Sequence, residues 1–330
     1  MTSPLKLYLL IIISSLFSIN TFSYETKPFS NMFIFGDSLS DTGNLQVFSQ
    51  NPSMPNRFTN GPVAIEVIAN KLNLNINNSL HLTGAQYGNN FAVAGAIAID
   101  EDNDEGTFDI NLPTQINSYL AFNQYQADQD ALYIIMIGGN DIRAAREAFI
   151  NGSWGEIFTA SSRLNEATDS IQQQLYKLVS AGAQNIMLVN APNIGAIPET
   201  DIVALNLKNN AENFRDHFIA KNLEEIAEFL TLNFNRKLKR VAKRVSKETG
   251  IKINHFNLFK FFNKLNKNYL KEGFSNNTDA CIYIITQNGT PNPSCNLDTF
   301  LFYDEIHPTA NVHALSGNAL YQAIVKKLIN

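Results

Sequence analysis

The folded part of the chain begins with four apolar residues and a polar turn, MFIFGDS at residues 32–38. An uninterrupted apolar run of this length, closed by Gly36, is typical of a strand that is buried on both faces of a parallel sheet. Three further runs of the same kind lie at residues 131–137, 185–189 and 251–256, and each adjoins a helical pattern. This alternation predicts βα units, and therefore an α/β fold whose mostly parallel sheet is covered by helices on both faces.

Helical periodicity accompanies these strands. Before the third strand, apolar residues recur every three or four positions until Gly182 ends the pattern: Leu164, Ala167, Ile171, Leu175, Leu178 and Val179. Residues 204–249 have the same periodicity, which we expect to break once near Leu232, and residues 314–328 predict one amphipathic helix. Because the connections are short and no Pro/Gly/Ser-rich linker is present, we expect a single domain over residues 24–330.

The first 23 residues have the order of a secretory signal peptide. Lys6 precedes an apolar run at residues 7–17, and a small-x-small site ends at Ser23. A membrane anchor is the alternative, but it needs ~20 apolar residues, and several serines and an asparagine interrupt this run. We therefore expect export with cleavage near Ser23, and a mature protein that is secreted or periplasmic.

The composition excludes several classes of function. The formal net charge is -5, with 25 Lys+Arg against 30 Asp+Glu, which is not the basic field of a nucleic-acid-binding protein. Two cysteines are too few for a Cys-only zinc site, and neither a His-Glu-x-x-His nor a Gly-x-x-x-x-Gly-Lys motif occurs. We therefore expect no metal, no cofactor and no nucleic acid. In an oxidising compartment Cys281 and Cys295 are expected to form a disulfide, with two free thiols as the alternative.

Polar residues with catalytic potential follow two of the strands, at the edge of the sheet where ligands bind in α/β folds. Ser38 follows the first strand and Asn140 the second. A serine at such a turn can attack an acyl carbon while N–H groups stabilise the oxyanion, although capping the next helix is the simpler role. Near the C-terminus, Asp304 and His307 are the carboxylate and the imidazole base that a nucleophilic serine requires.

Five sequence blocks resemble, in order, those of the GDSL (SGNH) esterase/lipase family. They are FGDSLSDTGN at residues 35–44, RFTNGP at 57–62, GNNFAVAGA at 88–96, GGND at 138–141 and DEIHPT at 304–309. The resemblance extends from about Met32 to the C-terminus and implies a three-layer α/β/α sandwich of flavodoxin-like type. It also implies Ser38 as the nucleophile, His307 as the general base and acid, and Asp304 as the residue that orients His307.

The oxyanion hole that the resemblance implies consists of the backbone N–H groups of Ser38 and Gly95 and the side-chain amide of Asn140. A glycine at position 95 lets a backbone N–H approach the oxyanion with no Cβ in the way, and Gly88 is the less favoured substitute. Asn140 supplies an uncharged donor. The remaining histidines are expected to be surface or core residues: His81, His217, His255 and His313.

Two charged stretches each allow two interpretations. Residues 100–105 contain five acids, but the glycine and the last ligand of a calcium loop are misplaced, so we expect a solvated loop without calcium. Residues 236–247 contain seven basic residues around an apolar stripe. Basic side chains in the last turns of a helix complement its dipole, which is the favoured explanation, and transient contact with an anionic membrane surface is the alternative.

The segments expected to cover the site, residues 96–128, 142–162 and 259–300, favour a lipid substrate. They are rich in aromatic residues: Phe108, Tyr119, Phe122, Tyr125, Trp154, Phe158, Phe261, Phe262 and Tyr269. This abundance favours an acyl-chain pocket over a sugar-acetate site. Together with export and a cysteine-bounded loop, the first block resembles the bacterial group of secreted phospholipase A, lysophospholipase A and glycerophospholipid:cholesterol acyltransferase.

The sequence therefore predicts an exported serine esterase that hydrolyses acyl esters of lysophospholipids or phospholipids. Three alternatives stay open: acyl transfer to cholesterol, hydrolysis of short-chain or carbohydrate esters, and a catalytically silent binding protein.

Overall fold

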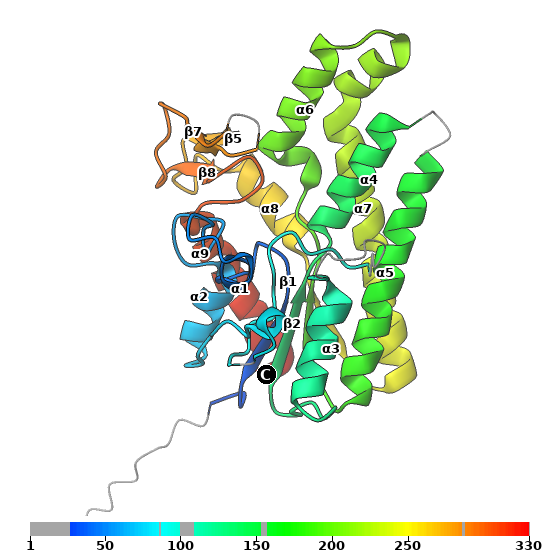
Figure 1. The fold of residues 1–330 in the computed structure, drawn as a ribbon, viewed down its shortest axis with the longest axis vertical. Helices are drawn as coiled ribbons and strands as arrows, with labels where there is room; N and C mark the ends of the chain where they lie inside the picture. The colour runs from blue at the N-terminus through cyan, green and yellow to red at the C-terminus, as the bar shows by residue number, and fades with distance from the viewer. Residues whose placement is uncertain (1–26, 86, 100–108, 153–156, 286–287, 330) are drawn as a thin grey trace, which may run out of the picture.

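The computed structural model describes residues 27–329 except 86, 100–108, 153–156 and 286–287 (Figure 1). The predicted signal peptide, the acidic stretch at 100–105, Phe108 and Trp154 lie outside the described residues. The strands are β1 (Met32–Gly36), β2 (Leu132–Met136), β3 (Asn185–Val189), β4 (Ile253–Phe256), β5 (Asn276–Ala280), β6 (Ile282–Tyr283), β7 (Thr290–Pro291) and β8 (Phe300–Phe302). The helices are α1 (Asn44–Ser49), α2 (Ala64–Lys71), α3 (Leu112–Phe122), α4 (Gly139–Asn151), α5 (Ile157–Ser180), α6 (Pro198–Asn209), α7 (Phe214–Thr249), α8 (Leu258–Lys267) and α9 (Ala310–Ile324).

The central sheet consists of the four apolar runs that the sequence predicts as strands. All four are parallel, in the order β1-β2-β3-β4. On the outer side of β1, residues 89–93 run alongside in the same direction: the Phe91 N–H donates to the Ile34 carbonyl at 2.8 Å and the Val93 N–H to the Gly36 carbonyl at 3.1 Å. The chain therefore adds residues 89–93 on one side of β1 and β2 on the other, so the order of the strands switches at β1. Ligands bind at such switch points in open α/β sheets.

Helices cover both faces of this sheet, which confirms the predicted three-layer α/β/α sandwich. Side chains alternate between the faces, so Phe35 and Ile135 pack with α3, α5 and α7, whereas Ile34 and Ile134 pack with α2 and α9. Figure 1 shows the strands between these two layers, with α2 and α9 on one side and α3, α5 and α7 on the other.

The predicted break near Leu232 is wrong. Residues around Leu232 lie inside α7, where Leu230, Phe234 and Leu238 form one continuous buried stripe. The helical segment breaks instead at residues 210–213, between α6 and α7, and α7 itself is kinked at Asn222, whose φ of -119° and ψ of 18° are not helical. The Asn213 side chain accepts a hydrogen bond from the Asp216 N–H at 3.0 Å. An asparagine cap satisfies an otherwise unpaired N–H of the first turn, and this signal was weaker in the sequence than the apolar periodicity.

The C-terminal part carries the disulfide predicted from the sequence. Cys281 and Cys295 are bonded across the loop that contains β6 and β7, and their Cα atoms are 5.0 Å apart. Within the described residues, no helix combines the length and the apolar character needed to span a membrane.

Candidate active site

The turn after β1 presents Ser38. The N–H groups of Ser40 and Asp41 both donate to the Asp37 carbonyl at 3.0 Å, and the Leu39 N–H donates to the Asp37 carboxylate at 3.1 Å. These bonds close a tight turn with Ser38 at its tip, at the carboxyl edge of the sheet. Burial raises the pKa of Asp37 to about 6, and the Leu39 N–H and the nearby charges of His307 and Arg143 only partly oppose this.

Ser38, His307 and Asp304 form one hydrogen-bonded series. The Ser38 Oγ lies 2.7 Å from His307 Nε2, and His307 Nδ1 lies 2.7 Å from Asp304 Oδ2. The Asp304 Oδ1 also accepts the backbone N–H groups of Ile306 at 2.8 Å and His307 at 2.7 Å. All three members are more than nine-tenths buried. The structure therefore joins residues that lie 269 positions apart in the geometry expected of a nucleophile, a base and its orienting carboxylate.

The loop that carries His307 is held from both sides. Within the loop, the Tyr303 N–H donates to the His307 carbonyl at 2.8 Å. From outside, the Thr59 hydroxyl donates to the Pro308 carbonyl at 2.9 Å, and the Phe58 ring lies 5.1 Å from the His307 ring. The RFTNGP block thus contacts the DEIHPT block, which explains physically why both occur in one sequence.

Asn140 lies opposite Ser38, at the start of α4. Its Nδ2 donates to the Ala96 carbonyl at 2.9 Å, and its Oδ1 accepts from Arg143 Nη1 at 3.2 Å. These two bonds fix which end of the amide carries the donors, and they leave the second Nδ2 hydrogen available. In the part of the chain that the structure describes, the backbone N–H groups of Ser38 and Gly95 also donate to no protein acceptor. Gly95 adopts a φ of 87°, which favours glycine.

Two buried carboxylates hold the loops that surround this position. The Asp41 carboxylate accepts the N–H groups of Gly43 and Asn44 in its own turn, and that of Ala94 at 2.8 Å in the loop that carries Gly95. The Asp141 carboxylate accepts the Ala98 N–H at 3.0 Å. Burial raises the pKa of Asp41, and it raises that of Asp141 to about 7.

An ion-pair network that the sequence analysis missed supports Asn140 and the His307 loop together. The Arg143 Nε donates to the Glu199 carboxylate at 2.8 Å, and the fully buried Arg146 donates to the same carboxylate at 2.9 Å. The Glu199 N–H in turn donates to the Glu305 carbonyl at 2.8 Å, between Asp304 and His307. These opposite charges lower the pKa of Glu199 although its burial acts in the other direction. No motif marks these residues, and charged residues at this spacing also occur on solvated helices, so the sequence alone does not reveal the network.

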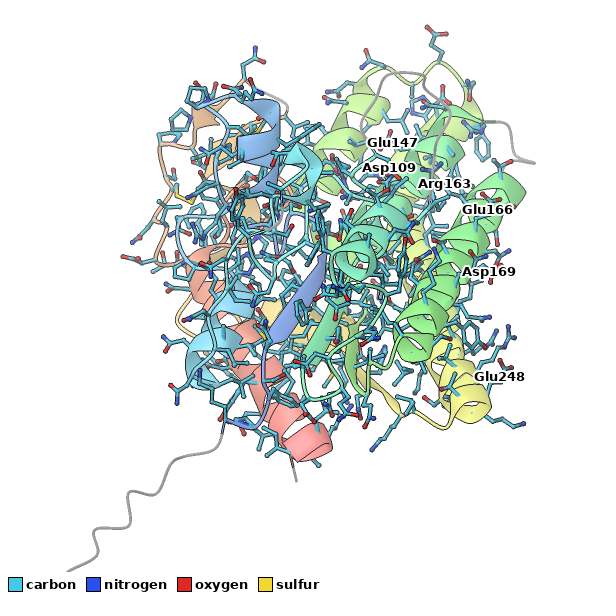
Figure 2. The ribbon with its side chains drawn as sticks, turned by 60° about the horizontal axis from the view of Figure 1, so that its bottom comes forward. Asp109, Glu147, Arg163, Glu166, Asp169 and Glu248 are labelled. Atoms are coloured by element: carbon cyan, nitrogen blue, oxygen red, sulfur yellow. A yellow bond between two sulfur atoms is a disulfide. The ribbon has the colours of Figure 1, made fainter. Side chains whose placement is uncertain are left out.

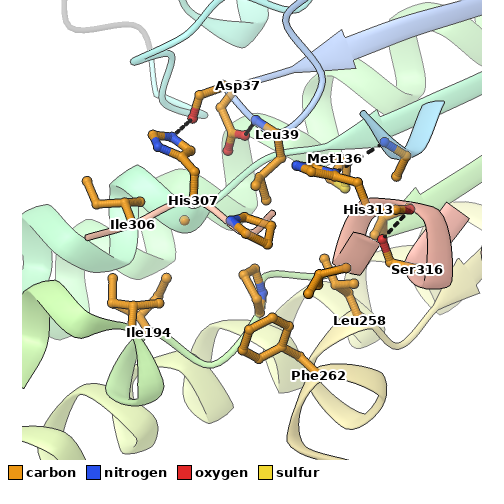
Figure 3. A pocket seen from close by; sticks show the side chains of 18 of the residues that line it. Asp37, Leu39, Met136, Ile194, Leu258, Phe262, Ile306, His307, His313 and Ser316 are labelled. Carbon is orange, nitrogen blue, oxygen red and sulfur yellow. Dashed lines mark hydrogen bonds between the residues drawn. The ribbon is translucent and has the colours of Figure 1, made fainter. Parts of the chain in front are cut away.

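An apolar pocket opens beside Ser38 and His307 (Figure 3). Its wall is mostly aliphatic, with three phenylalanines: Leu39, Ala64, Met136, Val189, Pro192, Ile194, Ile197, Phe256, Leu258, Phe262, Phe302, Ile306, Val312 and Leu320. Of the aromatic residues that the sequence analysis singled out, Phe262 lines this pocket. Tyr119 lies in the core, Phe261 and Tyr269 pack against the core outside the pocket, and Phe122 and Tyr125 are exposed. The prediction that those aromatic residues form the pocket is therefore wrong for these five positions. Aliphatic side chains of α9 and of the sheet take their place.

Gly88 and three of the remaining histidines lie outside the lining of this pocket, whereas His313 belongs to it. Gly88 packs so closely that a Cβ there would lie 2.2 Å from the Asn77 carbonyl oxygen, so its glycine is explained by packing. His81 is buried and His255 is half-buried, and this burial lowers the pKa of each to about 4. His313 is also buried, and it lines the pocket, which the sequence did not predict.

The basic stretch at 236–247 lies in the second half of α7, with its apolar stripe buried. Because α7 ends just before β4 begins, this half of the helix lies at the amino edge of the sheet, opposite the pocket. Figure 2 shows the same separation: Glu248 lies at the end of α7, far from Glu147, which pairs with Arg146 near the site. This position favours the helix-dipole explanation of the basic residues over contact with a membrane at the site.

A serine, a histidine and an aspartate that are hydrogen-bonded in series at the carboxyl edge of an α/β sheet are the features of serine hydrolases. The chain belongs to the GDSL-like Lipase/Acylhydrolase family, whose model matches residues 32–320. It is therefore a hydrolase that acts on esters. This confirms the family that the sequence blocks predict.

Relatives of this chain occur in plants and in bacteria. A GDSL esterase/lipase of Arabidopsis thaliana is 27% identical, over 87% of this chain and 85% of its own length. Lipase 1 of Photorhabdus luminescens is 27% identical, over 53% of this chain and 24% of its own length. The phosphatidylcholine-sterol acyltransferase of Aeromonas hydrophila is 24% identical, over 78% of this chain and 67% of its own length. The chain is thus similar both to ester hydrolases and to an acyltransferase.

Proposed function

We propose that this protein is an exported serine esterase that hydrolyses the acyl esters of lysophospholipids and phospholipids. The observation that carries the proposal is the hydrogen-bonded series Ser38–His307–Asp304, which opens directly into an apolar pocket. The series supplies the chemistry of ester cleavage, and the pocket supplies an environment for an acyl chain rather than for a sugar.

In the proposed mechanism, His307 Nε2 takes the proton of Ser38 as Oγ attacks the ester carbonyl. Asp304 keeps the proton of His307 on Nδ1 and stabilises the imidazolium that forms. The N–H groups of Ser38 and Gly95 and the Asn140 amide donate to the oxyanion. His307 then gives its proton to the leaving alcohol, which departs, and afterwards activates a water molecule that hydrolyses the acyl-enzyme.

Acyl transfer to cholesterol or another alcohol is the second candidate, because the chain is similar to a phosphatidylcholine-sterol acyltransferase. The reaction uses the same acyl-enzyme, and an alcohol replaces water in the second step. Adding cholesterol to a phospholipid assay and measuring cholesteryl ester against free fatty acid distinguishes the two reactions.

Export is supported by the order of residues 1–23 and by the Cys281–Cys295 disulfide, since disulfides persist in oxidising compartments. The mass of the protein purified from outside the cytoplasm tests this proposal. A mature chain that starts near residue 24 is expected, and a full-length cytoplasmic protein would contradict it.

The nucleophile assignment is tested by labelling with a fluorophosphonate probe and by a substrate panel of lysophosphatidylcholine, short p-nitrophenyl esters and acetylated sugars. Labelling and hydrolysis should disappear in Ser38→Ala. Ser40→Ala is the matched control, because Ser40 lies in the same turn and its hydroxyl has no hydrogen-bond partner within the described residues. Labelling that persists in Ser38→Ala would refute the assignment, and activity on acetylated sugars alone would refute the lipid substrate.

A further inference from the structure

We propose that the pocket beside Ser38 is the binding site of a single alkyl chain, and that Ser316 on α9 limits the length of the acyl chain that fits. The proposal rests on the proposed function, because it assigns the acyl part of the ester to this pocket. It adds a direction for the substrate: the chain points inward, under α9, and the alcohol points outward.

The position of the pocket relative to the nucleophile gives this direction. Ser38, His307 and Asn140 belong to the lining, together with Ile194 and Phe262. Because α9 begins three residues after His307, Val312, Ser316 and Leu320 line the wall at increasing distance along this helix from the His307 loop, facing the strand ends at Met136 and Val189. Figure 3 shows Ile194, Leu258 and Phe262 around the same space as His307, with Ser316 on α9 at its far side. An acyl carbon at Ser38 therefore places its chain between the sheet and α9.

The deep part of the pocket presents no charge to the chain. Asp37 and Arg143 are the acidic and basic residues of the described lining, and both lie near the nucleophile, Asp37 in the turn after β1 and Arg143 in the first turns of α4. His313 is neutral, because burial lowers its pKa to about 3 and its Nδ1 accepts the Ala64 N–H at 3.2 Å. The Ser316 hydroxyl donates to the His313 carbonyl at 3.1 Å, so its polarity is satisfied within the helix. An alkyl chain thus meets apolar atoms and already paired polar groups.

A small residue in this wall makes the chain-length limit adjustable. Ser316 is buried and lines the pocket with one of its smallest side chains, whereas Asn318, two positions on along the same helix, is exposed. A large side chain at 316 would take up the space of several methylenes, and the same side chain at 318 would project into solvent. The two positions therefore form a matched pair for one experiment.

The experiment measures kcat/KM for p-nitrophenyl esters with acyl chains from two to sixteen carbons. For the wild-type enzyme we expect kcat/KM to rise about fourfold for each added methylene that the pocket buries, and then to level off where the pocket ends. Ser316→Phe should lose more than about tenfold on chains of ten carbons or more while keeping the acetyl and butyryl esters within about twofold. Asn318→Phe should keep the wild-type profile.

Ser316→Leu provides a second, smaller substitution if the phenylalanine variant does not fold, and thermal unfolding shows which variants are folded. A folded Ser316→Phe or Ser316→Leu variant that loses the same factor on all chain lengths, or loses nothing, would overturn the proposal. So would a flat wild-type profile. Failure of the proposed function gives a different result. If Ser38 is not the nucleophile, the Ser38→Ala variant still hydrolyses these esters or is still labelled by the fluorophosphonate probe.

Discussion

Replacing Arg143 by methionine should slow catalysis through Asn140 rather than through the substrate. Arg143 Nη1 is the partner of Asn140 Oδ1 at 3.2 Å, and the Asn140 amide keeps only its bond to the Ala96 carbonyl when the guanidinium is removed. A hydrogen bond to a charged group contributes about 1.5–3 kcal/mol, and the remaining bond retains part of the orientation. We therefore expect Arg143→Met to lower kcat by roughly tenfold, which corresponds to about 1.4 kcal/mol, with KM changed by less than about threefold.

A double-mutant cycle tests whether Arg143 acts through Asn140. Asn140→Ala removes a proposed oxyanion donor and should lower kcat by about 10²–10³. If Arg143 only orients that donor, adding Arg143→Met to Asn140→Ala should cost less than about twofold more. If the factors by which the two single substitutions lower kcat multiply in the double variant, Arg143 has a role that is independent of Asn140 and this reasoning is refuted. Glu147→Gln is the control, because Glu147 is a half-exposed partner of Arg146 and has no bond to Asn140 within the described residues.

Three further predictions follow from the same structure. Asp304→Asn should lower kcat by about 10⁴-fold without loss of fold, because Asn can still accept the Ile306 and His307 N–H groups but no longer stabilises the imidazolium; an unchanged kcat would remove Asp304 from the mechanism. Replacing Cys281 and Cys295 by serine should lower the free energy of unfolding by about 3 kcal/mol, measured by denaturant titration, since the bridge closes a loop over a separation of 14 residues; an unchanged midpoint would contradict this. Burial raises the pKa of Asp141 from 3.8 to about 7, so between these pH values the folded state keeps a proton that the unfolded state has lost. The free energy of unfolding therefore falls as the pH rises from 3.8 to about 7. The melting temperature of Asp141→Asn relative to wild type should therefore increase from pH 5 to pH 8, and a constant difference would show that Asp141 does not titrate in this way.

The strands could be predicted from local signals in the sequence, and the residues of the series Ser38–His307–Asp304 could be predicted because short blocks around them resemble those of a known family. Each central strand is an uninterrupted apolar run, and a parallel sheet that is buried on both faces needs little else to be recognised. Ser38 and Asp304 lie in short ordered blocks in which polar residues interrupt the apolar pattern of the neighbouring strands. The helix break was mislocated for the opposite reason, because the cap at Asn213 is a single polar residue in a long periodic segment.

The network around Glu199 could not be predicted, because it depends on the packing of separate elements. Arg143 and Arg146 lie one turn apart on α4, and Glu199 begins α6 more than fifty positions later. Spacing of this kind occurs on many solvated helices, and only the approach of Glu199, in the first turn of α6, to Arg143 and Arg146 in the folded chain makes it a buried network. The pocket was misassigned for a related reason, since much of its wall comes from the last residues of β2, β3 and β4 and from single faces of α8 and α9, which the sequence marks only as core.

The two halves of the active site differ in how they are held. Ser38 follows directly from β1, at the rigid edge of the central sheet, whereas His307 lies on a loop beyond β8, outside that sheet. The position of the loop depends on contacts from other elements. The Glu199 N–H donates to the Glu305 carbonyl, and the Ile284 N–H, inside the disulfide loop, donates to the Glu305 carboxylate at 2.9 Å. A change in the disulfide loop or in α6 therefore reaches His307 while Ser38 stays in place. Because a base displaced by about 1 Å can cost about 100-fold in rate, such changes should lower kcat before they unfold the protein.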